Sequence, residues 1–250
     1  MPEKKAYMVD AVVIIPTYDE IENIERIIRN VFSLQRDFDI LIVDDSSPDG
    51  TALKVKQLQS DFSDRLFLIE RKGKLGLGTA YITGFKWALE RSYAFIFEMD
   101  ADFSHNPNDL IRLYNSCAKG SAQLAIGSRY ITGVNVVNWP MSRVLLSWCA
   151  SRYVRFITGM DIQDTTAGFV CYKREVLEKI NLEKIKFVGY AFQIEMKFKA
   201  YLLNFKIKEI PVIFTDRTRG TSKMSKGIIS EAIFGVLKMK FNSLFNRYEI

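Results

Sequence analysis

The segment Ala94-Phe95-Ile96-Phe97-Glu98-Met99-Asp100-Ala101-Asp102-Phe103-Ser104-His105 decides the fold, because a short apolar run passes almost directly into two carboxylates. Residues 94–97 are apolar and aromatic, which is typical of a strand covered on both faces of a parallel sheet. Asn106-Pro107 then predicts the start of a helix. We therefore expect Asp100 and Asp102 at the carboxyl end of a strand, where open α/β sheets bind their ligands.

The spacing of Asp100 and Asp102 suits a metal site. Residues two apart in an extended chain point to the same side, so one cation can bridge the two carboxylates. Oxygen ligands favour Mg²⁺ or Mn²⁺, ions that keep several waters and commonly complete their shell with substrate phosphates. Acids at this spacing also occur as turn or helix-capping residues, and the spacing alone leaves both interpretations open.

Similar apolar runs recur in the first half of the chain and alternate with helical stretches. These further predicted strands are Ala11–Ile15, Ile40–Val43, Leu66–Ile69 and Leu124–Gly127. We expect the first of them to stop at Pro16, because proline has no backbone N–H to donate to a ladder. Strands that alternate with crossover helices predict a doubly wound, mostly parallel α/β sheet.

The alternation changes after Tyr130. We expect helices over residues 142–157, 174–180 and 190–203, a strand over 167–172, and one strand over Ile207–Phe214 with Pro211 at an edge or bulge. The segment Lys226–Arg247 combines apolar residues at helical spacing with basic residues, which predicts an amphipathic basic helix. Such a helix lies in a membrane interface, covers the sheet or meets a partner helix, and the pattern favours the membrane only slightly.

Size and composition allow one large domain with an appendage. The 250 residues are 48% hydrophobic, and we expect a catalytic domain over residues 1–223 followed by the basic helix in residues 224–250. Three widely spaced cysteines favour a reducing, cytoplasmic compartment over a disulfide-stapled secreted protein. There is no signal-peptide core, and the longest stretch without Lys, Arg, Asp or Glu has 13 residues, so we expect no transmembrane helix.

The net charge of +6 is unevenly distributed. From Lys173 onward there are 16 Lys or Arg against 8 Asp or Glu, whereas the first 172 residues have 19 against 21. A basic surplus suits nucleic acid, an anionic membrane surface or a phosphorylated substrate, and it also describes ordinary solvated helix faces. The charge therefore does not select a partner, although acidic strand ends argue against nucleic acid in the predicted cleft.

One edge of the predicted sheet collects the polar residues that follow the strands. They are Pro16-Thr17-Tyr18-Asp19-Glu20, Asp44-Asp45, Gly76-Leu77-Gly78 and Asp100-Ala101-Asp102. This edge lacks both the glycine fingerprint of a dinucleotide fold and a Walker motif, and carboxylates dominate it. A diphosphate would need a metal ion there to neutralise it, which points to a nucleotide-diphosphate donor. Basic residues that could hold an anionic acceptor are Arg129, Arg143 and those of Arg217–Lys223.

Seven motifs carry a resemblance to a known family. They are Pro16–Glu20, Asp44–Thr51, Lys74–Tyr81, Met99–His105, Gly127–Tyr130, Gly189–Met196 and Arg217–Lys223. In this order they resemble the dolichol-phosphate (polyprenol-phosphate) mannosyltransferases, which are inverting GT-A glycosyltransferases of family 2. The resemblance extends from Val12 to about Lys223, and it implies a GT-A, Rossmann-like fold.

The resemblance also implies a reaction and the residues for it. The implied donor is GDP-mannose, the acceptor a polyprenyl (dolichyl-type) phosphate and the cofactor Mg²⁺ or Mn²⁺, at the cytoplasmic face of a membrane with or without a separate membrane-anchoring subunit. By motif position, the catalytic residues are Asp100, Asp102 and Arg129, of which Asp100 and Asp102 hold the metal. The donor-binding residues are Pro16, Tyr18, Glu20, Val43, Asp45, Asp100, Ala101, Asp102, Arg129, Arg217 and Lys223. The acceptor phosphate is assigned to Arg129, Arg143 and Lys223, and sugar hydroxyls or a buried structural role to Gln193 and Glu195.

A phosphate acceptor simplifies the expected mechanism. A phosphate monoester has a second pKa of about 6 and is largely dianionic at neutral pH, so it can attack the sugar without a strong general base. We therefore expect the lone histidine, His105, to be a turn or supporting residue. Two alternatives stay open: a polyprenyl-phosphate glucosyltransferase of the same fold that uses UDP-glucose, and a non-catalytic basic module that binds membrane surfaces or nucleic acid.

Overall fold

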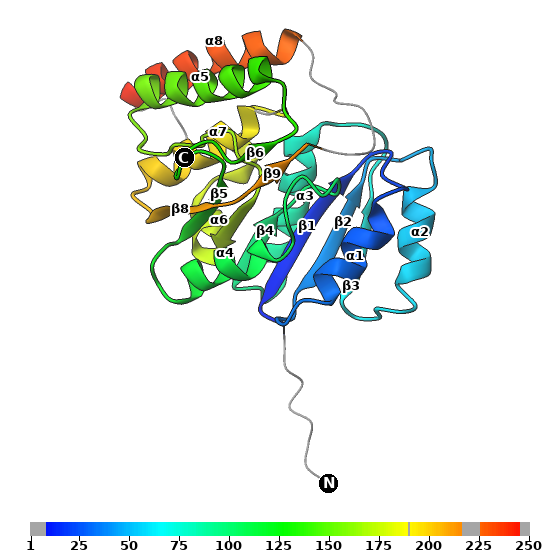
Figure 1. Ribbon diagram of the computed structural model, residues 1–250. Helices are drawn as coiled ribbons and strands as arrows, with labels where there is room; N and C mark the ends of the chain where they lie inside the picture. The colour runs from blue at the N-terminus through cyan, green and yellow to red at the C-terminus, as the bar shows by residue number, and fades with distance from the viewer. Residues whose placement is uncertain (1–8, 190, 217–225, 246–250) are drawn as a thin grey trace.

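Figure 1 shows the computed structural model, which describes residues 9–189, 191–216 and 226–245. Its main sheet has seven strands in the order β3-β2-β1-β4-β7-β5-β8. They are β1 (Ala11–Thr17), β2 (Asp39–Asp44), β3 (Leu66–Glu70), β4 (Phe95–Glu98), β5 (Leu124–Ser128), β7 (Val170–Lys173) and β8 (Ile207–Pro211). In this sheet β7 is antiparallel to both its neighbours and the other pairs are parallel, so the predicted mostly parallel α/β sheet is confirmed.

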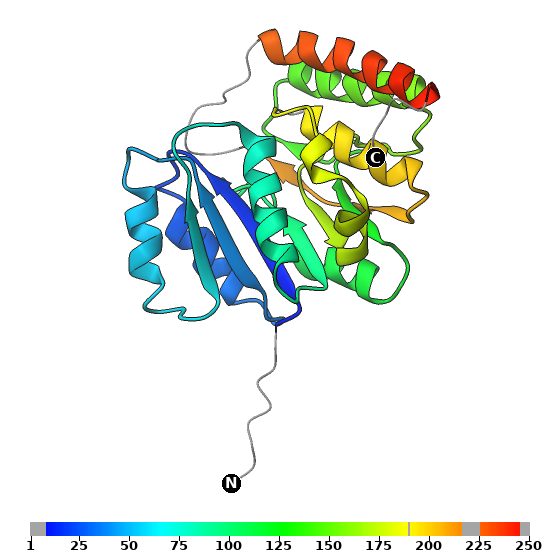
Figure 2. The same ribbon diagram turned by 180° about the vertical axis from the view of Figure 1, so that it is seen from behind.

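Helices cover both faces of the sheet because alternate residues of a central strand point to opposite sides. In β1, Val13 and Ile15 belong to one buried cluster, and Val12 and Ile14 belong to the other. The first cluster includes residues of α1 (Ile24–Phe32), α2 (Thr51–Leu58) and α4 (Asp109–Ala118); the second includes residues of α3 (Leu77–Leu89), α6 (Arg174–Lys179) and α7 (Ala191–Leu202). The opposite views in Figures 1 and 2 show these two layers of helices on either side of the strands.

β1 continues through Pro16 to Thr17, so the predicted end of the strand at Pro16 is wrong. The pairing of β1 with β4 ends at Ile14, whereas its pairing with β2 continues to Thr17. The carbonyl of Ile14 points toward β4, where it accepts from Met99 N at 3.2 Å. Pro16, two residues on, has its nitrogen on that same side, beyond the last β4 pair, so the missing N–H breaks no ladder hydrogen bond.

The single strand expected over Ile207–Phe214 is two strands in two sheets, which corrects that prediction. β8 ends at Pro211, and β9 (Phe214–Thr215) pairs in parallel with β6 (Val136–Val137). An antiparallel bridge joins Phe214 to His105, and Thr215 N donates to Ser104 O at 3.0 Å. The small second sheet is therefore tied to the loop that follows β4.

Helices α5 (Met141–Thr158) and α8 (Lys226–Leu244) lie side by side at the end of the molecule toward which β1 runs (Figures 1 and 2). Val236 and Met239 of α8 are buried, and Gly235 lies against Phe187, which follows the 3₁₀ helix η1 (Leu182–Lys184). Any larger residue at position 235 would clash, because a Cβ there would lie 2.5 Å from the Phe187 ring.

The predicted helix in the carboxyl-terminal appendage is present, and it packs on α5 and α7. The predicted domain boundary between residues 223 and 224 lies outside the described residues. Across the described ranges, every helix is too short or too polar to cross a bilayer.

Candidate active site

The loop after β4 places the two predicted acids at the carboxyl end of the sheet. Asp100 is half-buried, Ala101 is buried, and Asp102 is 8% exposed. Phe103 has φ = 60°, in the left-handed region, and this turn lets Ser104 N donate to Asp102 Oδ1 at 3.0 Å. The predicted turn role and the predicted site role of Asp102 are thus compatible, because one carboxylate oxygen orders the loop at the sheet edge.

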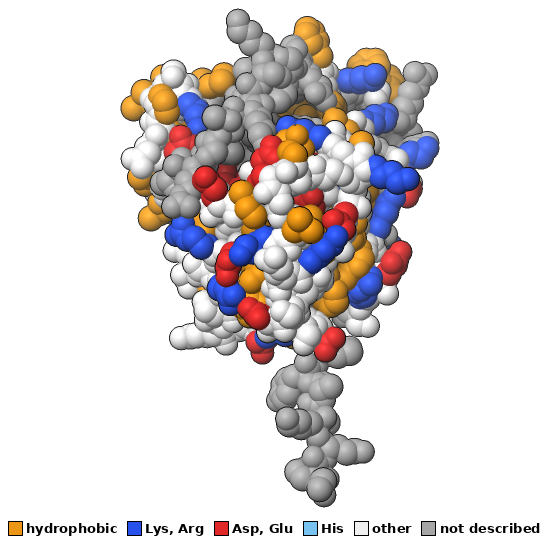
Figure 3. Space-filling view, turned by 90° about the vertical axis from the view of Figure 1, so that its right-hand side faces the viewer, with side chains coloured by type: hydrophobic (Ala, Val, Ile, Leu, Met, Phe, Trp, Pro, Cys, Tyr) orange, Lys and Arg blue, Asp and Glu red, His pale blue; other side chains and the backbone are white. Residues whose placement is uncertain are grey.

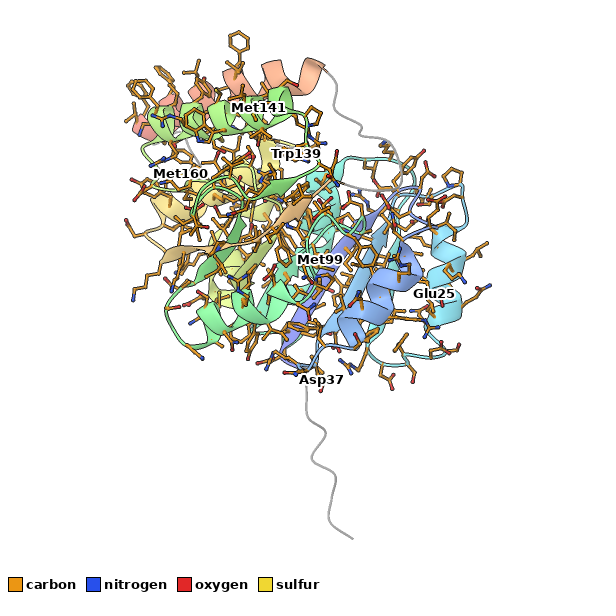
Figure 4. All side chains as sticks on the ribbon, viewed as in Figure 1. Glu25, Asp37, Met99, Trp139, Met141 and Met160 are labelled. Atoms are coloured by element: carbon orange, nitrogen blue, oxygen red, sulfur yellow. The ribbon has the colours of Figure 1, made fainter. Side chains whose placement is uncertain are left out.

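A cavity of about 460 Å³ brings four predicted site residues together: Asp100, Asp102, Arg129 and Arg143 all line it. Its apolar wall includes Leu146, Ala150, Tyr153 and Val154 of α5 and Ala191 and Ile194 of α7. Trp139, another lining residue, lies between Met99 at the end of β4 and Met141 at the start of α5 in Figure 4. The cavity therefore has a charged part, formed by these four side chains, and an apolar part formed by α5 and α7.

Arg129 follows β5 and is held by a buried carboxylate. Its Nε and Nη2 donate to the two oxygens of Asp164 at 2.6 Å each, and its backbone N–H donates to the same carboxylate at 3.0 Å. Thr166 Oγ1 accepts a further hydrogen bond from Nη2 at 2.9 Å. Burial alone would raise the pKa of Asp164, but the adjacent guanidinium more than offsets it and lowers that pKa below its ordinary value. Arg129 is therefore a rigid part of the cavity wall.

Arg143 lies near the start of α5 and is the more accessible of the two arginines. Its Nη1 pairs with Asp216 Oδ1 at 2.9 Å, and its guanidinium carbon lies 4.1 Å from the centroid of the Trp139 ring. The Arg143 side chain is 26% exposed, compared with 9% for Arg129. The cavity thus carries one arginine fixed by a buried partner and one that borders solvent.

His105 also lines the cavity, and it is buried. Its ring stacks on Phe169 with centroids 4.8 Å apart. Burial lowers the pKa of His105 to about 4, with the positive charge of Arg129 acting in the same direction. The imidazole is therefore neutral at neutral pH, which agrees with the supporting role expected for it.

The remaining described residues predicted to bind the donor nucleoside lie at the ends of β1 and β2, outside the walls of this cavity. They are Pro16, Tyr18, Glu20, Val43 and Asp45. Pro16 and Val43 are paired in register, and Lys74 Nζ lies 4.4 Å from the centroid of the Tyr18 ring. The backbone N–H of Glu20 donates to Thr51 Oγ1 at 3.0 Å. They share one sheet edge with the cavity, as the sequence predicted.

Asp45 takes part in an internal ion pair. Arg71 Nε donates to Asp45 Oδ1 at 2.6 Å, and Leu75 N donates to Oδ2 at 3.2 Å. Arg71 also donates to Thr79 Oγ1 at 2.8 Å and to Gly76 O at 3.2 Å. Asp45 therefore anchors the loop before α3 to the end of β2, and its predicted contact with the nucleoside stays a prediction.

Two predicted residues, Arg217 and Lys223, lie outside the described residues. Of the two candidates on α7, Gln193 lines the cavity, whereas Glu195 Oε2 accepts from the backbone of Lys186 and Phe187 at 2.9 and 3.1 Å. Glu195 thus has a structural contact.

Sequence reasoning missed Trp139, the apolar wall from α5, Asp164 as the partner of Arg129, and Lys197, because none of them belongs to a local pattern that marks a site.

The donor set in the cavity fits a divalent cation. Asp100 and Asp102 are carboxylates on one wall, and no cluster of three or more His, Cys, Asp and Glu side chains suited to a metal occurs in the part of the chain that the structure describes. Two carboxylates leave most of a cation's shell to waters and phosphate oxygens, which suits Mg²⁺ or Mn²⁺ and not a closed zinc site.

Known sequences resemble this chain over most of its length. The sequence model described as Glycosyl transferase family 2 matches residues 12–181. Polyprenol monophosphomannose synthase of Mycolicibacterium smegmatis is 46% identical over 235 residues, which are 94% of this chain and 88% of that protein. Undecaprenyl-phosphate mannosyltransferase of Micrococcus luteus is 42% identical over 225 residues, which are 90% of this chain and 91% of that protein.

Solved structures share the fold at low sequence identity. Glucosyl-3-phosphoglycerate synthase from Mycobacterium tuberculosis, in complex with Mn²⁺, UDP-glucose and phosphoglyceric acid, has a TM-score of 0.63 at 15% identity over 93% of this chain and 80% of that one. A mannosyltransferase from Pyrobaculum calidifontis, in complex with GDP-Man and Mn²⁺, has a TM-score of 0.59 at 17% identity over 96% of this chain and 65% of that one. The predicted GT-A, Rossmann-like fold is confirmed. On its sequence and its fold, this chain belongs to glycosyl transferase family 2.

Proposed function

We propose that this glycosyltransferase transfers mannose from GDP-mannose to a polyprenyl phosphate, with inversion at the sugar carbon. The observation that carries the proposal is a single cavity lined by Asp100, Asp102, Arg129 and Arg143 beside an apolar wall from α5. A cation on carboxylates suits a diphosphate, guanidinium groups suit a phosphate, and an apolar wall suits a lipid chain. The names of the two relatives at 42% and 46% identity support a mannosyl donor and a polyprenyl acceptor.

On the donor side, Asp100 and Asp102 would hold Mg²⁺ or Mn²⁺. The ion, when bound, supplies positive charge that stabilises the departing diphosphate. Both structural neighbours named above were solved with Mn²⁺, which supports a divalent cation in this fold. The strand ends around Tyr18 and Val43 would hold the nucleoside beside the cavity, and the GDP-Man complex of one neighbour supports GDP as the nucleotide.

On the acceptor side, Arg129 and Arg143 would orient the lipid phosphate. Its dianion can attack the anomeric carbon directly, so no strong base is needed, and the buried, neutral His105 does not have to act as one. The protein's contribution is to align the phosphate oxygen opposite the departing diphosphate and to hold two anions close together.

The two alternatives are less well supported. A UDP-glucose donor has support from the complex of one structural neighbour, but that protein is 15% identical, whereas the mannosyl relatives exceed 40%. A non-catalytic basic module conflicts with membership of a glycosyl transferase family. Parallel assays with GDP-mannose and UDP-glucose separate the two donors.

The proposal is tested by transfer of radiolabelled mannose from GDP-mannose to a polyprenyl phosphate, with and without a chelator. Transfer that the chelator stops and that added Mg²⁺ or Mn²⁺ restores supports donor, acceptor and cation together. Absence of transfer from GDP-mannose, with transfer from UDP-glucose under the same conditions, would replace the proposed donor.

We further propose that α5 and α8 attach the protein to a membrane surface. Large apolar side chains on these two helices are exposed: Met141, Phe156, Phe234, Phe241 and Leu244. Lys238 and Lys240 lie on α8 near them, as basic residues do on interfacial helices. Figure 4 shows side chains of α5 and α8 projecting from this end of the molecule. The three free cysteines fit the reducing, cytoplasmic side of the membrane, and a separate anchoring subunit stays a prediction.

Replacement of Phe156 and Phe234 by aspartate is expected to weaken binding to vesicles that contain anionic lipid. Phe156 is 87% exposed and Phe234 is 72% exposed, so the substitutions cost little folding energy. Loss of two aromatic side chains from the lipid interface should reduce vesicle binding about tenfold or more in a sedimentation assay.

Leu53→Asp is the matched control for the membrane test. Leu53 is 64% exposed on α2, on a side of the molecule where acidic, basic and apolar side chains are interspersed (Figure 3). The control variant should sediment with vesicles as the wild-type protein does. Equal binding by the double aspartate variant and this control would show that α5 and α8 do not contact the bilayer.

Cys149 offers a chemical test of the cavity. It is exposed and lines the cavity, whereas Cys117 and Cys171 are buried. N-ethylmaleimide is therefore expected to modify one thiol rapidly and to stop transfer by filling the cavity beside the apolar wall. A Cys149→Ala variant should keep its activity in the presence of the reagent. Equal inhibition of both proteins would place the inhibitory modification elsewhere.

A further inference from the structure

Helix α7 carries polar side chains although it is buried from Ala191 to Ala200. Gln193 is 1% exposed and Lys197 is fully buried. Buried polar groups are costly unless they are hydrogen-bonded. The hydrogen-bond partners of these two side chains therefore determine their orientation.

Lys197 fixes the orientation of the Gln193 amide. The ammonium group of Lys197 has three hydrogens and no acceptor, and it donates to Ala167 O at 2.6 Å, Gln193 O at 3.1 Å and Gln193 Oε1 at 3.1 Å. The amide oxygen of Gln193 must therefore point at Lys197, and the amide nitrogen must point away from it. There Nε2 donates to Glu98 Oε2 at 2.5 Å.

Glu98 completes this buried group from the end of β4, two residues before Asp100. It is fully buried, and its other oxygen accepts from the Tyr172 hydroxyl at 3.2 Å. Burial raises the pKa of Glu98 and lowers the pKa of Lys197, and the attraction between the two opposes both shifts. The Gln193 amide is therefore held by hydrogen bonds between the carboxyl group of Glu98 and the amino group of Lys197.

One of the two hydrogens on Gln193 Nε2 donates to no acceptor among the described residues, and the side chain lies at the cavity wall. Gln193, Gly168 and Asp100 all line the cavity. Gly168 has no side chain, and a Cβ built there would lie 3.7 Å from Nε2, so the glycine leaves the approach to the amide nitrogen open. This position offers a ligand a hydrogen-bond donor and no acceptor, because the amide oxygen is taken by Lys197.

We propose that Glu98 and Lys197 are positioning residues that hold Gln193 so that its second amide N–H donates to a hydroxyl oxygen of the transferred sugar. The inference rests on the proposed function and adds the two buried residues that fix which atom of the Gln193 amide faces the sugar. A sugar that lacks this hydroxyl would leave a buried N–H without a partner, which is the strongest way in which a site rejects an analogue.

Exchange of the two side chains, Glu98→Gln together with Gln193→Glu, tests the proposal. In the exchanged protein the new amide donates to the new carboxylate, Lys197 donates to that carboxylate, and Tyr172 donates to the remaining amide oxygen. The net charge and the number of internal hydrogen bonds are unchanged. At the cavity wall a carboxylate accepts where the amide donated. At residue 98 the new amide has a second hydrogen that the carboxylate lacked, and the thermal midpoint measures the cost of burying it.

For the exchanged protein we expect kcat/KM with GDP-mannose to fall about 10- to 100-fold. The Kd for GDP with Mn²⁺, which lacks the sugar, should stay within about twofold, and the thermal midpoint should stay within a few degrees. Transfer by the exchanged protein at the wild-type kcat/KM would overturn the proposal.

Donor analogues test the same inference in the unaltered protein. Among GDP-mannose analogues that each lack one hydroxyl, we expect one to lose about 10- to 100-fold in kcat/KM with wild-type protein. That analogue should lose little more in the exchanged protein, because the hydroxyl and the amide are coupled. Equal losses for every analogue in both proteins would overturn the assignment of Gln193.

The experiments distinguish failure of the proposed function from failure of the role proposed for Gln193. The rate of wild-type protein with GDP-mannose tests the proposed function, whereas the ratio of exchanged to wild-type protein tests the role of Gln193. If wild-type protein uses another nucleotide sugar in place of GDP-mannose, the proposed function is overturned, and the same ratio measured with that sugar decides the inference.

Discussion

An Asp102→Ala variant is expected to lose mannosyl transfer by about a thousandfold or more while it remains folded. Asp102 is one of two carboxylates at the cavity wall, and its removal takes away one of the two side chains proposed to hold the cation. The side chain accepts a hydrogen bond from Ser104 N at 3.0 Å, and the loss of that bond should lower the free energy of unfolding by about 1 kcal/mol. The measurements are the transfer rate at saturating Mn²⁺ and urea unfolding.

Asp37→Ala is the matched control for Asp102→Ala. Asp37 precedes β2 at the opposite edge of the sheet (Figure 4), and its side chain is 72% exposed. It should transfer mannose at the wild-type rate. Near-normal transfer by Asp102→Ala, or equal losses in the two variants, would remove the basis for a metal site at the end of β4.

An Asp164→Ala variant is expected to lose about 3–5 kcal/mol of stability, together with transfer activity. Asp164 is fully buried and accepts both side-chain hydrogen bonds from Arg129 at 2.6 Å, so its removal leaves a buried guanidinium without its counter-ion. Because the pKa of Asp164 is lowered in the folded protein, its contribution to stability is present above its ordinary pKa of 3.8 and is lost as the pH falls through the lower, folded value. Urea unfolding at neutral and acid pH measures both effects.

A double variant, Arg129→Met with Asp164→Leu, distinguishes the stability of the ion pair from its role in the reaction. Replacing both charges with apolar side chains removes the unpaired buried charge, so most of the lost stability should return. Transfer should stay low, because the cavity then lacks the arginine assigned to the acceptor phosphate. Recovery of both stability and transfer would show that Arg129 has no part in binding the phosphate.

The parts of the fold that local patterns determine were predicted. The apolar runs of β1 to β5 and the acidic end of β4 follow from burial on both faces of a parallel sheet. The position of β7 between β4 and β5 was not predicted. Strand order depends on contacts between distant segments, and the sequence of Val170–Lys173 does not indicate it. Pro16 misled the prediction because a proline interrupts a ladder only where its nitrogen faces a paired strand, and the pairing of β1 with β4 ends at Ile14.

The charged part of the site was more accessible to sequence reasoning than its polar interior. Asp100, Asp102, Arg129 and Arg143 follow strands or begin a helix, and the structure brings them into one cavity. Lys197 and Gln193 lie in a helix that is buried all round, where apolar periodicity marks neither residue. The resemblance named Gln193, and Lys197 was missed. The pairing of Arg129 with Asp164, 35 residues later, is likewise a contact that only the folded chain creates.

Helix α5 supplies residues to two different surfaces. Ala150 and Val154 line the cavity, whereas Met141 and Phe156 are exposed at the end of the molecule. On the proposed attachment, the acceptor would enter sideways from the bilayer, and its hydrocarbon tail would never have to pass through water. Catalysis would then be a two-dimensional encounter, in which the rate follows the mole fraction of acceptor in the bilayer and falls when inert lipid dilutes it, even at a constant total amount of acceptor.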